Sequence, residues 1–283
     1  MGIRNGYLSV KASLNLWEAL VRSNLEYASE VWGFEKWREG EQLQIVMSKR
    51  ILRCPTKTSN AASLGDLGLW SLQGRRNLKK LIYWRNIFFL SDSNLVKQSY
   101  LFSKTSGKKS SWAMKIRKLL IQYKIYHVWQ DPSILLNLDN HGNNESKNNK
   151  DHKRFWNKFI TDKILDYEQK AWLREINSKD KLRTYRIIKN KLSLEKYLNT
   201  TNNPFGRALH SSIRNGSNFL EIEKGRWKHV PVEKRICTQC DSKKVEDEVH
   251  FLLICSRYKD LRLKLFAIIL NISKGKWNLA IYQ

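Results

Sequence analysis

The chain of 283 residues carries 52 Lys and Arg residues against 26 Asp and Glu residues, a formal net charge of +26 with a pI near 10.0. Its 41% hydrophobic content suffices for a buried core and argues against wholesale disorder. No apolar run approaches the roughly 18 residues of a membrane span, and four cysteines are too few for a disulfide scaffold. The start of the chain shows no secretory signal, so we expect an intracellular protein, nuclear or cytoplasmic, with no membrane partner.

Unneutralised positive charge of this size predicts a polyanionic partner. A chain at +26 should bind RNA or DNA at least non-specifically, because Lys and Arg side chains replace the counterions that surround the phosphates. A basic protein that is merely soluble is the alternative interpretation.

The N-terminal half, residues 1–136, has the pattern of a helical bundle. Apolar residues recur at helical spacing over residues 8–36 and again over 43–52, which predicts two helices. The two glycines of the segment 64–72 indicate a turn before a basic helix that begins near Gly74. Helical periodicity returns over residues 111–129. We therefore expect a basic domain made of packed helices.

Residues 67–130 form the most basic stretch, with thirteen Lys and Arg residues against Asp92 as the one acid. Arg75 and Arg76 each pair at i,i+4 with a lysine, which predicts two basic columns on one face of a helix and apolar residues on the other. We expect the basic face to meet solvent or phosphate, although a merely solvated face is the alternative for any single residue. The candidate contacts with nucleic acid here are Arg75, Arg76, Lys79, Lys80, Arg85, Lys115, Arg117, Lys118 and Lys124.

A polar, Asn-rich segment over residues 137–153 is interpreted as a flexible linker. The segment after it, residues 154–230, is expected to be a helical connector, because apolar residues repeat at helical spacing over 155–172 and again over 182–198. Asn203 followed by Pro204 is typical of a helix start. Residues 218–222 and the surroundings of Ile236 are the strand candidates.

The last segment, residues 231–283, predicts a small zinc module with a terminal helix. Cys237, Cys240, His250 and Cys255 have the spacing Cys-x2-Cys-x9-His-x4-Cys. Two thiolates from a tight turn, with a His and a Cys from a following helix, can surround one ion tetrahedrally. Since four protein ligands leave no open position, the zinc should be structural and should not activate water. A cluster of reduced cysteines without metal is the alternative.

Two further expectations concern acids and tryptophans. Residues 246–248 are all acidic and should lie in the first turn of the helix that carries His250, where the helix dipole favours negative charge. Most of the eleven tryptophans should pack in the core. Trp84, Trp112 and Trp227 lie among Lys and Arg residues in the sequence, so stacking on the bases of single-stranded nucleic acid is an equal alternative for them. Arg226 and Trp227 complete the candidate contacts.

Three segments carry a family resemblance. The first is residues 20–33 (LVRSNLEYASEVWG), followed by 64–68 (LGDLG) and Arg75-Arg76; the second runs from 181–185 (KLRTY) through Arg207, His210 and Arg214 to 221–227 (EIEKGRW); the third joins 235–240 to 245–255. Together they resemble the C-terminal part of the polyprotein of non-LTR retrotransposons, the LINE-type reverse transcriptases. The resemblance implies a helical thumb, a connector that grips template RNA and target DNA, and a CCHC zinc segment that aids nucleic-acid binding.

The sequence departs from that family where catalysis is concerned. Polymerase chemistry needs paired carboxylates that hold two metal ions about 4 Å apart, and the chain has no Asp-Asp pair. It has no Pro-Asp dipeptide of the family's nuclease, no P-loop and no hydrolase motif. We therefore expect a non-catalytic RNA- or DNA-binding fragment that lacks the polymerase palm and has no small-molecule substrate. The alternative is a zinc-stapled helical module that binds an acidic protein partner.

Overall fold

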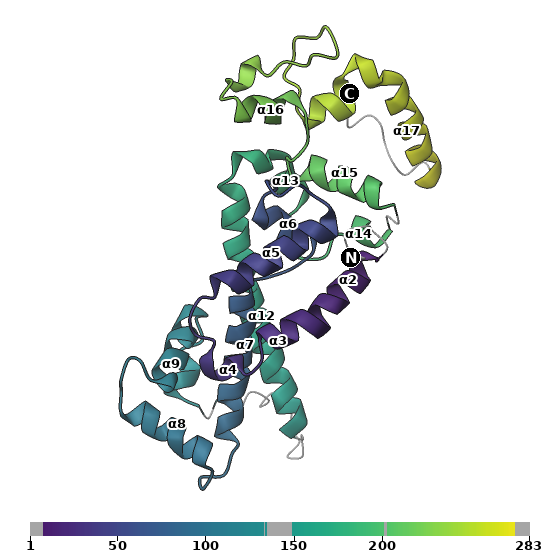
Figure 1. Cartoon of the computed structure of the whole chain (residues 1–283). Helices are drawn as coiled ribbons and strands as arrows, with labels where there is room; N and C mark the ends of the chain where they lie inside the picture. The colour runs from purple at the N-terminus through teal and green to yellow at the C-terminus, as the bar shows by residue number, and fades with distance from the viewer. Residues whose placement is uncertain (1–7, 133, 135–148, 201–202, 275–283) are drawn as a thin grey trace.

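The computed structural model describes residues 8–132, 134, 149–200 and 203–274, and over these ranges it is mainly helical. Within them the backbone forms no β-sheet, only isolated antiparallel bridges between Leu67 and Leu194 and between Ile236 and Val245. The prediction of a mostly α fold is confirmed. The helices are arranged along an elongated body, with α16 near one end and α8 and α9 at the other (Figure 1).

The first N-terminal helix is shorter than the periodicity predicts, whereas the helix predicted over 43–52 is present and begins earlier, at Arg38. One helical run over residues 10–25 ends before Ala28, whose φ of 49° is left-handed, so residues 8–36 do not form a single helix. Ser9 caps the run by accepting a hydrogen bond from the backbone N–H of Ala12. The elements are α2 (Val10–Leu16), the π-helical η1 (Trp17–Arg22), α3 (Ser23–Leu25), α4 (Ser29–Trp32), α5 (Arg38–Leu52) and α6 (Asn60–Asp66).

The basic helix, α7 (Leu72–Phe88), begins two residues before the predicted start. Its N-cap is Ser71, whose hydroxyl oxygen accepts from the Gly74 N–H at 2.8 Å. The carboxylate of Glu41 accepts from the N–H groups of the first two residues of α7 at 3.2 and 2.9 Å. Glu168 accepts from the Ser71 N–H at 3.1 Å. Two acids from distant helices therefore satisfy the positive end of α7 and fix its position.

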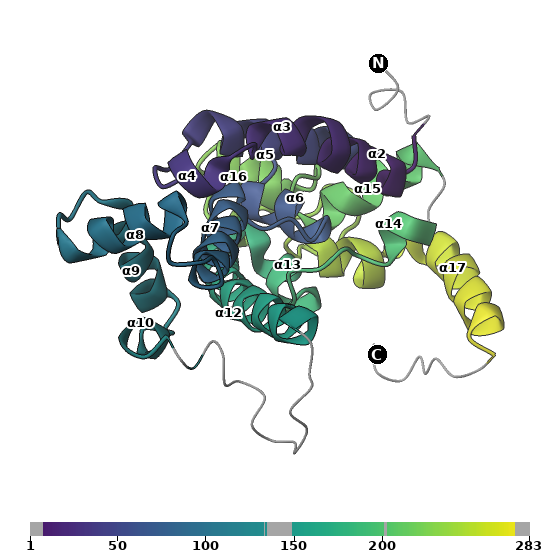
Figure 2. The same ribbon diagram turned by 90° about the horizontal axis from the view of Figure 1, so that it is seen from below.

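The largest core lies between α7 and the helices that follow it. Trp84, Ile116, Leu120, Trp156 and Ile160 are all buried in this one cluster. Figure 2 shows α7 and α12 beside each other, and they are in contact. The helices involved are α7, α8 (Leu95–Thr105), α9 (Trp112–Gln122), α10 (His127–Gln130) and α12 (Asn149–Asn177).

This core corrects the predicted division at residues 136 and 154. Trp156 and Ile160 come from the expected connector, yet they pack against Trp84 and Ile116 of the expected N-terminal domain. The apolar stripe of α12 can only be buried against another element, so the two segments share one core. Residues 149–153 of the predicted linker belong to α12, and residues 137–148 lie outside the described ranges.

Smaller cores join the connector to the N-terminal helices. Trp172 and Tyr185 pack against Ala61 and Ala62 of α6, and Leu198 packs in a cluster with Val10. The connector elements are η2 (Asp180–Leu182), α13 (Arg183–Ile188), α14 (Tyr197–Thr200), α15 (Pro204–Arg214) and α16 (Glu221–Trp227). We call everything from residue 8 to residue 227 the helical body.

Two predictions for the connector are wrong and one is confirmed. The helix expected over 182–198 ends at Ile188, because the chain then extends to form the bridge between Leu194 and Leu67. No strand forms over 218–222, because residues 218–220 form a turn in which Asn218 accepts from the Leu220 N–H, and α16 begins at the next residue. Asn203 is the N-cap of α15, as predicted, and accepts from the two following N–H groups at 2.9 and 3.3 Å.

The C-terminal segment, residues 231–274 of the described chain, is called the Cys/His module here. Its elements are η3 (Val232–Lys234), the π-helical η4 (His250–Ile254), η5 (Ser256–Tyr258) and α17 (Lys259–Ile272). The Ile236–Val245 bridge is one residue pair long, so the predicted strand near Ile236 is reduced to that pair. Among the described helices, none is long and apolar enough to cross a membrane.

Candidate metal centre and basic surfaces

The four predicted ligands come from a turn and from the helical segment after it. The turn is closed by hydrogen bonds from the Cys237 N–H to the Lys244 carbonyl at 2.9 Å and from the Glu246 N–H to the Arg235 carbonyl at 3.0 Å. This short ladder holds Cys237 at the base of the turn and Cys240 within it. His250 begins η4, and Cys255 ends it with its N–H donating to the His250 carbonyl at 2.7 Å.

The ligand atoms of these four residues all lie within 4.8 Å of one another. Cys237 Sγ is 4.0 Å from Cys255 Sγ, and Cys240 Sγ is 3.4 Å from His250 Nε2. Bonds of about 2.3 Å to sulfur and about 2.0 Å to nitrogen imply tetrahedral edges of about 3.8 Å between sulfurs and about 3.5 Å between sulfur and nitrogen. The prediction that the four side chains come together is confirmed, and their spacing fits one tetrahedral cation.

The thiols differ in their acidity before any cation binds. Burial raises the pKa of the Cys237 thiol to about 12. A hydrogen bond from the Ser242 hydroxyl, with a sulfur–oxygen distance of 3.1 Å, lowers the pKa of the Cys240 thiol to about 6. His250 is buried, and its Nδ1 has no hydrogen-bond partner in the described chain, whereas its Nε2 faces Cys240. Of these two thiols, Cys237 is the less acidic, and a cation that binds here would have to displace its proton.

The three acids of residues 246–248 do not act alike. The prediction that they lie at the start of the helix that carries His250 holds for Asp247 alone. Asp247 accepts from the His250 N–H at 2.7 Å and caps the helical turn that carries this ligand. Glu246 and Glu248 are buried, and both contact the helical body, although Glu246 also accepts from the Cys237 thiol with a sulfur–oxygen distance of 3.6 Å. Glu246 accepts from the Glu221 N–H at 2.8 Å, at the start of α16.

Glu248 is the centre of an ion-pair network that the sequence reasoning missed. Arg183 of α13 donates to both of its carboxylate oxygens, at 2.7 and 2.8 Å, and Asn218 donates to it at 3.0 Å. Arg183 also pairs with buried Glu223 at 3.0 Å, and Glu223 pairs with Arg226 at 2.9 Å. The signal in the sequence was three consecutive acids in a strongly basic chain. This network ties the segment before His250 to α13 and α16.

The structure corrects the predicted basic face of α7. Arg76, Lys80 and Arg85 are buried, so these three do not belong to an exposed contact surface. Lys80 Nζ donates to the Gly33 carbonyl at 2.6 Å and lies 4.3 Å from the centre of the Phe34 ring. The aromatic segment around α4 covers this face, because its rings can accept the flat guanidinium and the ammonium. Burial, with the charges of Arg76 and Lys115, lowers the pKa of Lys80 to about 7.

The other predicted contacts lie nearer to solvent. Lys118 and Lys124 are exposed, and Lys79, Lys115 and Arg117 are half-buried. Lys79 donates to the Glu26 carbonyl, Lys115 approaches Glu35 at 3.8 Å, and Arg117 donates to the Tyr126 hydroxyl. Half-buried Arg75 lies over Trp70, with 4.7 Å between the guanidinium carbon and the ring centre. Their contact with nucleic acid stays a prediction.

The three tryptophans that have Lys and Arg neighbours in the sequence differ in their surroundings in the structure. Trp84 is fully buried and donates to the Tyr100 hydroxyl at 3.1 Å, so the stacking alternative is wrong for it. Trp112 is half-buried among aromatic rings and donates to the Glu30 carbonyl at 3.0 Å. Trp227 is 49% exposed at the end of α16. The structure therefore leaves Trp227 as the accessible member of the three.

Comparison with known proteins adds no relative to this description. No family model, no curated protein and no solved structure matches the chain.

Proposed function

We propose that the protein binds RNA or DNA, as the resemblance to the C-terminal region of non-LTR reverse transcriptases implies, and that it has no polymerase or nuclease activity of its own, because its sequence lacks the Asp-Asp pair and the Pro-Asp dipeptide of that family. The supporting observation is that the core buries no excess of positively charged side chains. In the described chain the buried bases (Arg76, Lys80, Arg85, Lys189, Arg207) equal the buried acids (Glu26, Asp66, Glu223, Glu246, Glu248) in number. The positive excess of the described residues therefore stays outside the core, where phosphates can reach it.

The metal in this proposal is zinc, held by Cys237, Cys240, His250 and Cys255. Three thiolates and one imidazole at tetrahedral spacing form a ligand set that suits zinc. Because the protein supplies all four ligands, the ion would stabilise the fold and would not activate water. Elemental analysis of the purified chain should find one equivalent of zinc, and Cys240→Ser or His250→Ala should lose it. Full metal content in both variants would refute this ligand set.

Binding measurements test the nucleic-acid proposal directly. Zinc-replete protein is titrated with labelled single-stranded RNA, duplex DNA and an RNA–DNA hybrid across a salt series, with heparin as a polyanion that is not a nucleic acid. A preference among the nucleic acids that persists at about 0.15 M salt supports the proposal, because binding driven by counterion release alone weakens steeply with salt. Equal binding to every polyanion, heparin included, contradicts it.

A protein-interaction module is the second candidate, and α17 favours it. This helix buries none of its residues and exposes Leu261, Leu263, Leu265, Ile268 and Ile272. Contiguous exposed apolar side chains are typical of surfaces that bind other proteins. A purified complex that survives nuclease treatment, and that Leu261→Ser with Ile268→Ser dissociates, would favour this candidate over the first.

A further inference from the structure

A second basic surface, away from α7, is built from three segments that are distant in the sequence. The end of α5 and the residues after it contribute Lys49, Arg53 and Lys57. Lys181 belongs to η2, and Trp227 is the last residue of α16. We call this group, together with Arg226, the α5–α16 surface.

Short contacts hold these segments together. Lys181 Nζ donates to the Lys57 carbonyl at 2.9 Å, and Lys49 Nζ donates to the Thr56 carbonyl at 2.7 Å. Lys57 Nζ lies 4.9 Å from the centre of the Trp227 ring. Burial lowers the pKa of Lys181, Glu223 raises it, and the positive charges of Arg226 and Lys49 lower it again. The cations are therefore close enough to act on one another.

Arg226 pairs with Glu223, but among the described residues the other cations of this surface have no acidic partner in an ion pair. Within the described chain, Lys49, Arg53, Lys57 and Lys181 form no ion pair. Arg53 also has a φ of 55°, in the left-handed region that normally favours glycine at the end of a helix. Like charges gathered without acids repel one another, and a bound polyanion would remove that repulsion.

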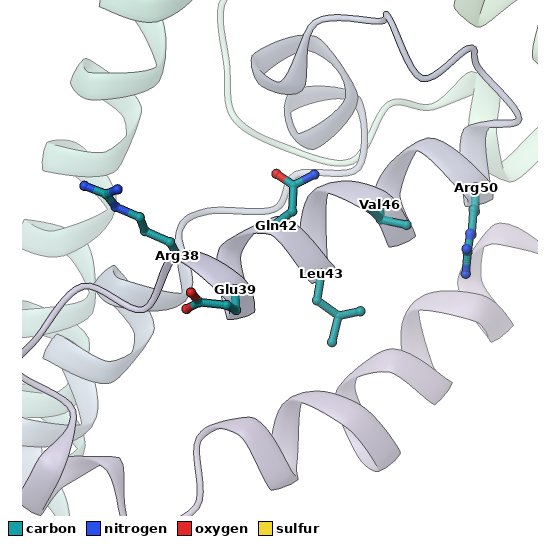
Figure 3. Close-up of a pocket in the computed structure, with 6 residues that line it drawn as sticks. All are labelled: Arg38, Glu39, Gln42, Leu43, Val46 and Arg50. Carbon is teal, nitrogen blue, oxygen red and sulfur yellow. The ribbon is translucent and has the colours of Figure 1, made fainter.

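A groove along α5 extends the same positive surface. Figure 3 shows the side chains of α5 that line its first part, with Arg38 at one end and Arg50 at the other. The adjoining part shares Gln42, Val46 and Arg50 with it and continues to Arg53. Glu39 is the one acid among these lining residues. A flexible anionic chain could therefore follow α5 towards Trp227.

We propose that the α5–α16 surface binds a single-stranded nucleic-acid segment, with phosphates on Arg53, Lys57 and Lys181 and a base stacked on Trp227. This inference rests on the proposed function and names the site and the strandedness of its ligand. A duplex keeps its bases stacked on one another, so an exposed indole flanked by cations selects a strand whose bases are free. The binding mode is tolerant of base sequence, because every base presents an aromatic face.

The test uses the full zinc-replete chain with a labelled 15-nucleotide RNA, the DNA of the same sequence and the corresponding DNA duplex. Trp227→Ala should weaken binding of the single strands roughly tenfold, because the variant loses the stacking of one base. Trp227→Phe should restore most of the affinity. Duplex binding should change by less than twofold in both variants. Comparison of the RNA and DNA arms shows which sugar the site accepts.

The charged part of the surface is tested with Arg53→Gln combined with Lys57→Gln. This double variant should weaken single-strand binding and reduce the slope of log affinity against log salt by about 1.4, since each phosphate contact on a single strand contributes about 0.7. Lys108→Gln combined with Lys109→Gln removes the same charge from exposed residues between α8 and α9, at the end of the molecule opposite α16 in Figure 1. This control variant should leave the slope nearly unchanged. Trp32→Ala is the control for Trp227→Ala, since Trp32 is also 49% exposed. Equal zinc content and thermal unfolding establish that the variants are folded.

The outcomes separate this inference from the proposed function. If the wild-type chain shows no nucleic-acid binding beyond its binding of heparin, the proposed function fails and this inference fails with it. If the wild type prefers single strands but Trp227→Ala matches Trp32→Ala, or both charge variants lower affinity equally, the proposed function stands and the α5–α16 surface is overturned.

Discussion

The helical body and the Cys/His module bury different kinds of side chain. The body encloses large apolar residues, among them Trp84, Trp156 and Leu52. In the described part of the module the buried residues are Cys237, Glu246, Glu248, His250 and Cys255, and none of them is an aliphatic residue, Phe, Tyr or Trp. The helical body is therefore organised around apolar side chains, and the Cys/His module around the Cys and His side chains of the candidate metal centre and two buried acids.

This difference predicts separate sources of stability. Burial of apolar area contributes roughly 25 cal/mol per Å², so the body has its own driving force for folding. The described part of the module fully buries no large apolar side chain, so we expect it to depend on metal–ligand bonds and on the hydrogen bonds of Glu246 and Glu248 with the body. The body should therefore fold without metal, whereas the module should not.

Metal removal should give the largest effect, and it should be confined to the module. A strong chelator, or Cys240→Ser, should unfold residues 231–274, since structural zinc contributes an apparent ~10–16 kcal/mol in zinc-finger peptides. Hydrogen exchange followed by mass spectrometry should show lost protection there and retained protection in α7, α9 and α12. Cys54→Ser is the control, because Cys54 lies outside the ligand cluster. Loss of protection throughout the body would contradict the comparison.

A core substitution in the body should have the complementary effect. Trp84→Ala should lower the free energy of unfolding of the body by ~3–5 kcal/mol, because it removes a fully buried indole from the aromatic cluster. Urea unfolding followed by far-UV circular dichroism measures this change. Folded Trp84→Ala protein should still carry one equivalent of metal. A variant that unfolds normally but loses metal would show that the module depends on this core.

The local patterns of the sequence predicted the metal cluster and many helices correctly. The spacing of Cys237, Cys240, His250 and Cys255 was sufficient because the four ligands lie within nineteen residues, and a turn with a following helix brings them together without distant contacts. The capping pair Asn203 and Pro204 located the start of α15 for the same reason. Local signals predict local structure.

The missed features depend on contacts between distant segments. The basic columns of α7 looked like a solvated face, but Lys80 is covered by Gly33 and Phe34, which lie 47 and 46 positions earlier. The Arg183–Glu248 pair joins residues 65 positions apart. The periodicity of a sequence predicts that a helix has an apolar and a charged face. It does not predict which distant segment packs against the charged face. The α5–α16 surface is of the same kind, since three separate segments assemble it.

The link between the two parts can be tested at Arg183. Arg183→Met should lower the free energy of unfolding by ~2–4 kcal/mol, because Glu248 would remain buried without its ion pair. Metal affinity should fall about tenfold, since Glu248 positions the segment that carries His250. Arg186→Met, on the same helix, is the control, because Arg186 donates to a backbone carbonyl and has no buried acid to leave unpaired. Competition with a chelating dye measures the metal affinity. Identical behaviour of the two variants would show that the parts are independent.

The most gradual effect concerns the pH dependence of the body. The pKa of Lys80 is lowered from 10.5 to about 7 by burial, so between these pH values the unfolded chain binds a proton that the folded chain has released. Stability from this residue therefore rises as the pH increases from about 7 towards 10, by at most about 1.4 kcal/mol per pH unit. Lys80→Met should flatten this rise in urea unfolding midpoints measured between pH 6.5 and 9.5, whereas Lys79→Met, whose side chain is 41% exposed, should preserve it. The Cys/His module should respond in the acidic range instead, where protonation of its ligands releases the metal. A wild-type body whose midpoint does not change above pH 7 would show that the Gly33 carbonyl and the Phe34 ring keep Lys80 protonated despite its burial.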